Sequence, residues 1–148
     1  KYKFESFGIT SDRLIFNNIV CKDSHFSAYK LADIGLDPTP FNGLTITIEA
    51  ISMGLPILTL IGQSMQSRGC ARVNKALKLD DLIATNEDEY IKKGVKLSKD
   101  IKKLDYYRKN LRNILFNSKL MKDSDGFATR VENAYQKAWD DYCKSFYI

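Results

Sequence analysis

The stretch from residue 33 to residue 60 constrains the fold more than any other part of this 148-residue chain. A short apolar segment at 34–36 ends in a loop that holds two prolines and the pair Asn42-Gly43. The loop leads into an amphipathic segment at 45–53, and a second apolar run at 57–60 follows. This order predicts a strand, a loop, a helix and a parallel strand. In such a unit the start of the helix offers unpaired backbone N–H groups to an anion, such as a nucleotide phosphate, at the carboxyl end of the sheet.

The rest of the chain shows the same alternation of short apolar runs and amphipathic segments. The expected strands are 13–16, 34–36 and 57–60, and 82–84 is a further short apolar piece. The expected helices are 22–31, 45–53, 65–76, 87–102, 105–116 and 124–143. We therefore expect an α/β fold with a partial Rossmann-like parallel sheet, helices on both faces and long helices at the end. Residues 1–148 are expected to form a single domain.

Composition and charge narrow the classes of function. Hydrophobic residues make up 44% of the chain, as in a folded globular protein. The net charge of +5 is concentrated at 92–112, where Lys92, Lys96, Lys99 and Lys103 recur at helical spacing. This pattern favours a solvated helix face over a nucleic-acid patch, although a small basic nucleic-acid-binding protein stays open as a third interpretation.

Three widely separated cysteines predict neither a disulfide framework nor a zinc site, and we expect no metal. Reduced thiols and the lack of a long apolar run predict a cytoplasmic protein without a membrane partner.

Several short motifs, in one order along residues 8–143, resemble the C-terminal half of O-GlcNAc transferases and their SPINDLY-type relatives. They are Asp33-Ile34-Gly35-Leu36-Asp37, Asn42-Gly43 with Thr45, Ala50 to Pro56, Ser67-Arg68, Asp81 to Ala84, Asn86 to Tyr90, Leu111-Arg112 and Ala138 to Tyr142. No single motif is diagnostic, but the series is specific. The resemblance implies the second half of the donor-binding domain of a GT-B glycosyltransferase of family 41, with the acceptor-facing domain and helical repeats upstream of Lys1.

The candidate site begins at Gly43-Leu44-Thr45. Gly43 permits a close backbone approach, the N–H groups of residues 44–46 point out of the helix start, and Thr45 adds a hydroxyl donor. An ordinary N-cap threonine would have the same local sequence. Glu49 lies one turn later on the same stripe, where a carboxylate accepts hydrogen bonds from vicinal hydroxyls. A surface glutamate is the plain alternative, and the resemblance favours a ribose-binding role for Glu49.

The resemblance adds residues from the preceding helix. His25, the only histidine, would stack on or hydrogen-bond the base and sugar, and Lys22 would reach the ribose or a phosphate. The backbone of Val20 is a weaker candidate for the base edge. Arg68 lies in a segment that is close to the donor in relatives, although a structural ion pair is the other interpretation. No residue of this chain is expected to act as the catalytic base.

Two departures leave the donor open. The O-GlcNAc transferase branch has a histidine where this chain has Leu44, and a second threonine where it has Ile46. Glu49 in place of aspartate is closer to SPINDLY-like sequences, which use GDP-fucose. The donor substrate is therefore UDP-GlcNAc or GDP-fucose, and no separate cofactor is expected.

Two functions rank ahead of the nucleic-acid-binding interpretation. The first is the donor-binding part of an inverting protein O-glycosyltransferase, whose protein acceptor is bound through the upstream half. The second is a truncated or degenerate remnant that binds a nucleotide or a protein without catalysis. The last expected helix carries an aromatic stripe of Phe127, Tyr135, Trp139 and Tyr142, which we expect to be partly exposed and to drive self-association.

Overall fold

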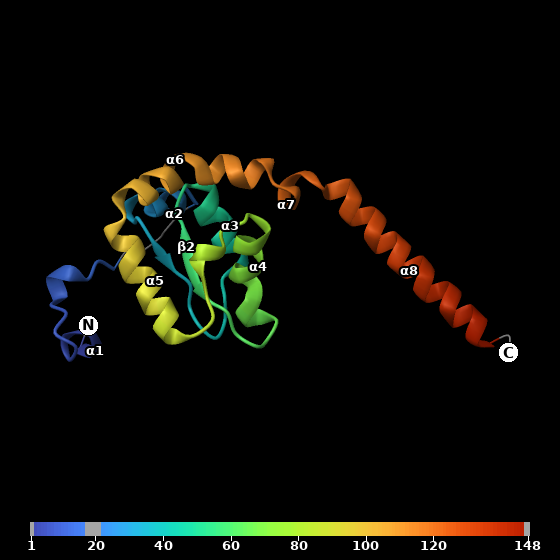
Figure 1. Ribbon diagram of the computed structural model, residues 1–148, viewed down its shortest axis with the longest axis horizontal. Coiled ribbons are helices and arrows are strands. Elements are labelled where there is room, and N and C mark those ends of the chain that lie inside the picture. Colours follow the sequence, from blue (N-terminus) through green and yellow to red (C-terminus); the bar gives the residue numbers. More distant parts are fainter. Residues whose placement is uncertain (1, 17–21, 147–148) are drawn as a thin grey trace.

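The computed structural model describes residues 2–16 and 22–146; the side chains of residues 22–24, 124, 125 and 146 lie outside this description. Figure 1 shows an α/β body at whose C-terminal end a long helix, α8, extends outward. The strands are β1 (Gly35–Leu36), β2 (Ile57–Leu60) and β3 (Ile83–Ala84). The α-helices are α1 (Tyr2–Glu5), α2 (Lys22–Ala28), α3 (Leu44–Ser52), α4 (Gly69–Ala76), α5 (Glu87–Lys99), α6 (Ile101–Asn117), α7 (Lys119–Lys122) and α8 (Ser124–Phe146). Short 3₁₀ turns are η1 (Ser11–Arg13), η2 (Tyr29–Leu31), η3 (Gln66–Arg68) and η4 (Asp80–Leu82).

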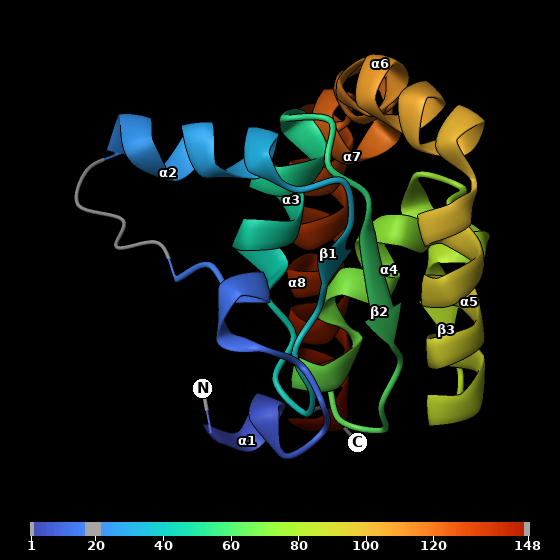
Figure 2. The ribbon, with the colours of Figure 1, turned by 90° about the vertical axis from the view of Figure 1, so that its left-hand side faces the viewer.

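The three strands form a parallel sheet in the order β1-β2-β3. Gly35 is in register with Ile57, and Thr59 is in register with Ile83. Successive side chains of β2 point to opposite faces. Ile57 packs with Ala50 of α3 and with α4, while α5 approaches Leu58 on the other face. Figure 2 shows α3 and α5 on opposite sides of β1 and β2. The prediction of a parallel sheet covered on both faces is confirmed.

The main core lies between the helices that follow the strands. It contains Ile51 of α3, Leu82 of η4 and Leu111 of α6, which are all at most 1% exposed. Tyr107, also in α6, lies in the same cluster. Helix α6 therefore shares one hydrophobic core with the helices that cover the sheet.

The predicted strand at 13–16 is wrong. Ser11–Arg13 forms the turn η1, and the N–H of Leu14 donates to the carbonyl of Ser11 at 3.2 Å. Ile15 is 84% exposed, so this apolar run does not enter the core. A strand needs a neighbouring strand to which it can hydrogen-bond, and β1 pairs here with β2. The third strand is instead the short piece at 83–84.

The boundary between the two helices after β3 also differs from the prediction. α5 ends at Lys99 and α6 begins at Ile101, because the carboxylate of Asp100 accepts the N–H of Lys103 at 3.0 Å as an N-cap. The predicted N-cap at Asn86 is confirmed, since its side chain accepts the N–H of Glu89 at 2.9 Å.

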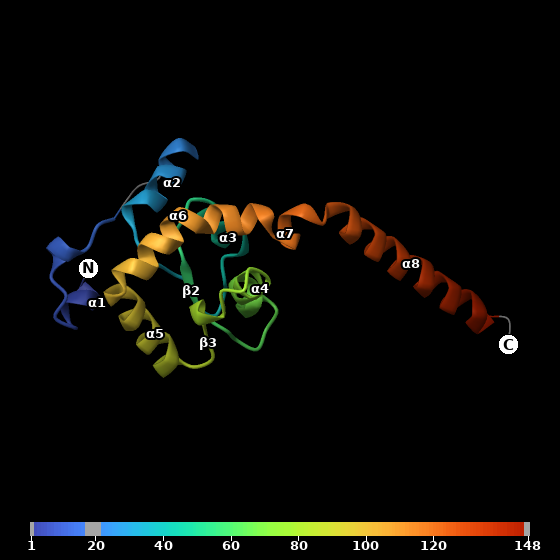
Figure 3. The ribbon, with the colours of Figure 1, turned by 45° about the horizontal axis from the view of Figure 1, so that its top comes forward.

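Helix α8 extends away from the body in both Figure 1 and Figure 3. Its aromatic residues are exposed: Tyr135 by 74%, Trp139 by 61% and Tyr142 by 55%. No helix among residues 2–16 and 22–146 is both long and apolar enough to cross a membrane.

Candidate functional site

Helix α3 begins in a way that leaves backbone donors available. Gly43 is its N-cap, in an extended conformation, and the first α-helical bond runs from the Thr47 N–H to the Gly43 carbonyl at 2.9 Å. Within the described residues, the N–H groups of Leu44, Thr45 and Ile46 have no hydrogen-bond acceptor. The positive end of the helix dipole lies at the same place. The start of α3 therefore has the chemistry of an anion-binding site.

The N–H of Gly43 itself is directed into the protein. It donates to Oδ1 of Asp37 at 3.0 Å, and the hydroxyl of Thr59 donates to Oδ2 at 2.7 Å. Asp37 is only 6% exposed and Thr59 is fully buried. The loop is also held by Asn42, whose side chain donates to the carbonyl of Pro38 at 3.1 Å. These bonds fix the loop that precedes α3, and with it the direction of the free N–H groups.

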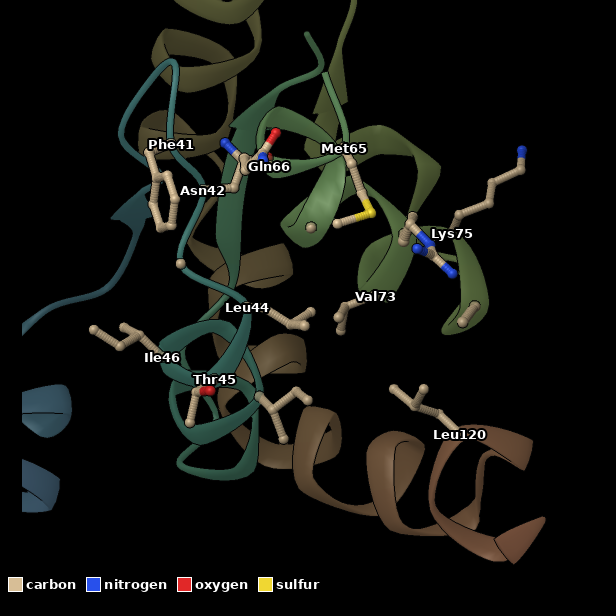
Figure 4. A pocket seen from close by; sticks show the side chains of 15 residues that line it. Phe41, Asn42, Leu44, Thr45, Ile46, Met65, Gln66, Val73, Lys75 and Leu120 are labelled. Atoms are coloured by element: carbon tan, nitrogen blue, oxygen red, sulfur yellow. The ribbon is translucent and has the colours of Figure 1, made fainter. Parts of the chain in front are cut away.

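A cavity of about 1020 Å³ opens between α3, α4 and α7, and Gly43 to Ile46 form one of its walls. Figure 4 shows Leu44 and Val73 pointing toward one another across it, with Leu120 on a third side and Met65 above. Most of the lining is hydrocarbon. The amine of Lys75 lies at the rim, where it pairs with Asp80 at 2.6 Å. The cavity is thus apolar, with backbone N–H groups along one edge.

A polar cluster lies on the α2 side of α3. Nε2 of His25 is 2.9 Å from Oε2 of Glu49, and the hydroxyl of Tyr29 donates to the same oxygen at 3.2 Å. The Tyr29 hydroxyl is also 3.0 Å from Nε2 of His25. The side chains of His25 and Glu49 are 29% and 31% exposed, so a ligand can reach both.

Burial raises the pKa of Tyr29 to about 12, and the Glu49 charge and the hydrogen bond to Glu49 act in the same direction. The Tyr29 hydroxyl therefore stays protonated at neutral pH and acts as a donor to the carboxylate.

The residues predicted from the sequence fall into two groups on the first two turns of α3. Gly43, Leu44, Thr45 and Ile46 line the cavity, whereas Glu49 joins His25 in the polar cluster. One turn, a rise of about 6 Å, separates Thr45 from Glu49 along the helix axis. Figure 4 shows Ile46 pointing away from Leu44. The apolar cavity and the polar cluster of His25, Tyr29 and Glu49 therefore lie on different sides of the start of α3.

The remaining predicted residues lie elsewhere or outside the description. Val20 is outside the described residues. Lys22 begins α2, and its side chain is likewise outside them. Arg68 donates from Nε to the carbonyl of Gly62 at 2.9 Å and lines a different cavity.

Tyr29 and Asp37 belong to the candidate site but are not among the residues predicted from the sequence. Tyr29 lies four residues after His25 and so on the same helix face, a signal that was available. Asp37 directly follows β1, at the strand end where parallel sheets gather polar groups. Within the part of the chain that the structure describes, no group of three or more His, Cys, Asp or Glu side chains is arranged to hold a metal ion.

Known proteins match this chain along almost its whole length. The model of the family described as Glycosyl transferase family 41 matches residues 1–129. A protein named probable UDP-N-acetylglucosamine–peptide N-acetylglucosaminyltransferase SPINDLY from Arabidopsis thaliana is 34% identical over 141 residues, 95% of this chain and 15% of the relative. The tomato (Solanum lycopersicum) protein of the same name is 33% identical over 140 residues, 94% of this chain and again 15% of the relative.

A solved structure of an O-GlcNAc transferase mutant from Thermobaculum terrenum matches the fold with a TM-score of 0.84 at 29% identity. The match covers 97% of this chain and 28% of that protein. The chain thus spans about 15% of the length of the curated relatives.

Proposed function

Because the chain belongs to glycosyl transferase family 41, we propose that it is the donor-binding part of an inverting protein O-glycosyltransferase. The observation that carries the proposal is that two features lie one turn apart on α3. Free N–H groups are at the start of the helix, and the cluster of Glu49 and His25 follows. A nucleoside diphosphate has matching parts, an anionic diphosphate next to a ribose with vicinal hydroxyls.

In this proposal the diphosphate lies against the N–H groups of residues 44–46 and the hydroxyl of Thr45. These donors stabilise the negative charge that develops on the leaving diphosphate when an acceptor Ser or Thr hydroxyl attacks the sugar. Glu49 accepts from ribose hydroxyls, and His25 contacts the base or sugar. The family resemblance adds two further contacts to this proposal, Lys22 with the ribose or a phosphate and the Val20 backbone with the base edge.

Catalysis requires more than this chain. We propose that the acceptor protein and any base near its hydroxyl are held by the upstream part of the enzyme, so the chain by itself is inactive. UDP-GlcNAc is the first candidate donor, because the SPINDLY relatives are named as UDP-N-acetylglucosamine–peptide N-acetylglucosaminyltransferases. GDP-fucose is the competing donor, because Glu49 in place of aspartate is closer to SPINDLY-like sequences, which use GDP-fucose. A cytoplasmic location belongs to the same proposal.

Substitution of Glu49 tests the proposed ribose contact. Glu49→Gln removes the charge while keeping the side chain's shape, so the affinity for UDP or GDP should fall about ten- to a hundredfold, as for loss of a charged hydrogen bond. Equilibrium titration by calorimetry measures this change. Glu132→Gln, an exposed glutamate on α8, is the matched control and should bind as the unchanged protein does. Equal affinities for all three proteins would overturn the assignment of Glu49.

A second function rests on the exposed hydrocarbon at the proposed phosphate site. Leu44 and Ile46 are 51% and 55% exposed, where the O-GlcNAc transferase branch has hydrogen-bonding side chains. A non-catalytic remnant would tolerate these residues. Saturable nucleotide binding by the chain separates the first function from the second.

Self-association through α8 is part of the proposal on partners. Its exposed aromatic residues include Tyr135 and Trp139, and burying them against a second copy removes apolar surface from water. Gel filtration at several concentrations should show an apparent mass that rises with concentration. A strictly monomeric profile throughout would refute it.

A further inference from the structure

Tyr29 is held firmly at the junction of α2 and η2. Its carbonyl accepts a hydrogen bond from Arg108 of α6 at 3.3 Å. Its side chain packs against the cluster of Ala50, Leu55, Ile57 and Cys70, which joins α3, α4 and the sheet. The tyrosine hydroxyl is therefore presented to Glu49 from a fixed position.

The hydrogen bonds of the cluster converge on one atom. Oε2 of Glu49 receives both the Tyr29 hydroxyl and Nε2 of His25, whereas Oε1 has no partner among the residues described. An ionised carboxylate only accepts, so the contact with Glu49 requires a proton on Nε2 of His25. In the neutral ring Nδ1 is then an acceptor. Two acceptors, Oε1 of Glu49 and Nδ1 of His25, are left for a ligand.

We propose that Tyr29 is a positioning residue of the nucleotide site: by occupying Oε2 of Glu49 together with His25, it aims Oε1 at the ribose hydroxyls. This inference rests on the proposed nucleotide-binding function. Without the hydroxyl, the carboxylate keeps a single protein donor and rotates more freely. Recognition of the ribose then weakens, while contacts to the diphosphate at the start of α3 are unaffected.

A tyrosine that served only for packing would behave differently. Its ring fills space against Ala50 and Ile57 and would do so equally well as phenylalanine. The hydroxyl, by contrast, donates to Oε2 of Glu49 at 3.2 Å. Burial is the main cause of the raised pKa of Tyr29, and the Glu49 charge acts in the same direction. Removal of the hydroxyl alone therefore separates the two roles.

The test compares binding of UDP and GDP with binding of their 2′-deoxy forms, in the unchanged chain and in Tyr29→Phe. The unchanged chain should prefer the ribonucleotide, and Tyr29→Phe should reduce that preference about three- to tenfold. Affinity for the deoxynucleotide should stay the same. Tyr106→Phe, which removes the hydroxyl of a tyrosine on α6 that is 53% exposed, is the control and should change neither value. Equal loss of affinity for both nucleotides, or no loss, would overturn the proposal.

A second measurement needs no ligand. His25 is the only histidine, so long-range ¹H–¹⁵N spectra report its ring nitrogens without overlap. The unchanged chain should show the proton on Nε2, and Tyr29→Phe should shift these resonances toward a mixture of tautomers. Unchanged His25 resonances would refute the positioning role. If the unchanged chain binds none of the nucleotides, the proposed function fails, and these spectra alone decide whether Tyr29 positions the pair.

Discussion

Asp37 is the residue on which the start of α3 depends. Its buried carboxylate accepts from the Gly43 N–H and the Thr59 hydroxyl. An ion in the interior is stable only when it is well hydrogen-bonded, because burial removes its hydration. The two bonds therefore stabilise the loop geometry and the carboxylate together.

Thr59→Val removes one of those donors and keeps the volume of the side chain. We expect the free energy of unfolding to fall by about 1–3 kcal/mol, since Asp37 is left with an unmet acceptor in the interior. Urea unfolding followed by circular dichroism measures the change. Ser98→Ala, which removes an exposed hydroxyl bonded to its own helix, is the control and should stay within about 0.5 kcal/mol. An unchanged free energy of unfolding in Thr59→Val would show that the hydrogen bond from Thr59 to Asp37 does not stabilise the fold.

Asp81 links α6 to η4 and gives a prediction for acid stability. Burial acts to raise its pKa, but bonds from Lys103 and Tyr107 outweigh it, and the pKa lies below the ordinary 3.8. A lowered pKa means that the folded state binds the proton less tightly than the unfolded chain. This contribution is thus present above pH 3.8 and is lost as the pH falls through the folded pKa.

In Asp81→Asn the free energy of unfolding should therefore fall less steeply as the pH is lowered into the acid range. Urea midpoints measured at neutral pH and below the ordinary aspartate pKa should differ less in the variant than in the unchanged chain. The exposed Asp140→Asn on α8 is the control and should keep the original dependence. An identical acid dependence in Asp81→Asn would contradict the role of this carboxylate.

Among the elements, α6 is the one that holds the site-bearing helices together. Arg108 donates to the carbonyls of Tyr29 and Ala32 after α2, and to that of Met53 after α3. A guanidinium at the C-terminal ends of helices also complements their dipoles. The position of His25 relative to Glu49 thus depends on a residue far from both in the sequence.

Arg108→Met should loosen α2 and η2 selectively. The aliphatic part of the side chain is kept, and the lost bonds should lower stability by about 1–3 kcal/mol. Native-state hydrogen exchange should show reduced protection at 25–32 and unchanged protection in α5. An equal loss of protection at 25–32 and in α5 would instead indicate global destabilisation. It would contradict a local role of Arg108.

Gly54 fixes the turn between α3 and β2. Its φ is 80°, and a Cβ at this position would lie 2.6 Å from the carbonyl oxygen of Arg108. Gly54→Ala should therefore destabilise the fold by about 2 kcal/mol or more. Gly69→Ala, where a Cβ would make only ordinary contacts, is the control. Comparable thermal midpoints for the two variants would contradict this account.

The sequence was most informative about elements whose pattern is local. The apolar run of β2 and the amphipathic α3 were predicted almost to the residue, because strand and helix periodicity are encoded in neighbouring positions. The run at 13–16 was misjudged since hydrophobicity does not reveal whether a pairing strand is present. The contact of Tyr29 with Glu49 joins residues that are 20 positions apart in the sequence. It depends on how α2 packs on α3, and a local sequence pattern does not encode that packing.

At the scale of the whole molecule, the body and α8 differ in how they are stabilised. The core runs from Ala50 to Leu115, and α8 contributes none of the buried hydrophobic residues of the described chain. Family resemblance led to the prediction of an exposed aromatic stripe, and the exposure of Trp139 and Tyr142 is observed. This stripe is the surface that the proposed self-association would remove from water.

Removal of residues 124–148 should leave the body folded. Because the core lies upstream, the thermal midpoint of the shortened chain should match that of the unchanged chain, and concentration-dependent self-association should disappear. Differential scanning calorimetry and gel filtration measure the two effects. Unfolding of the shortened body would show that α8 stabilises it.

We propose that the start of α3 and the His25–Glu49 cluster together form one nucleotide site. An amide NMR titration of the chain with UDP, GDP, UDP-GlcNAc and GDP-fucose tests it most directly. The account predicts saturable shifts at 43–46, at His25 and at Glu49 with a single affinity, and the tighter nucleotide identifies the donor. Absence of shifts with all four nucleotides, or saturable shifts confined to other parts of the chain, would contradict it.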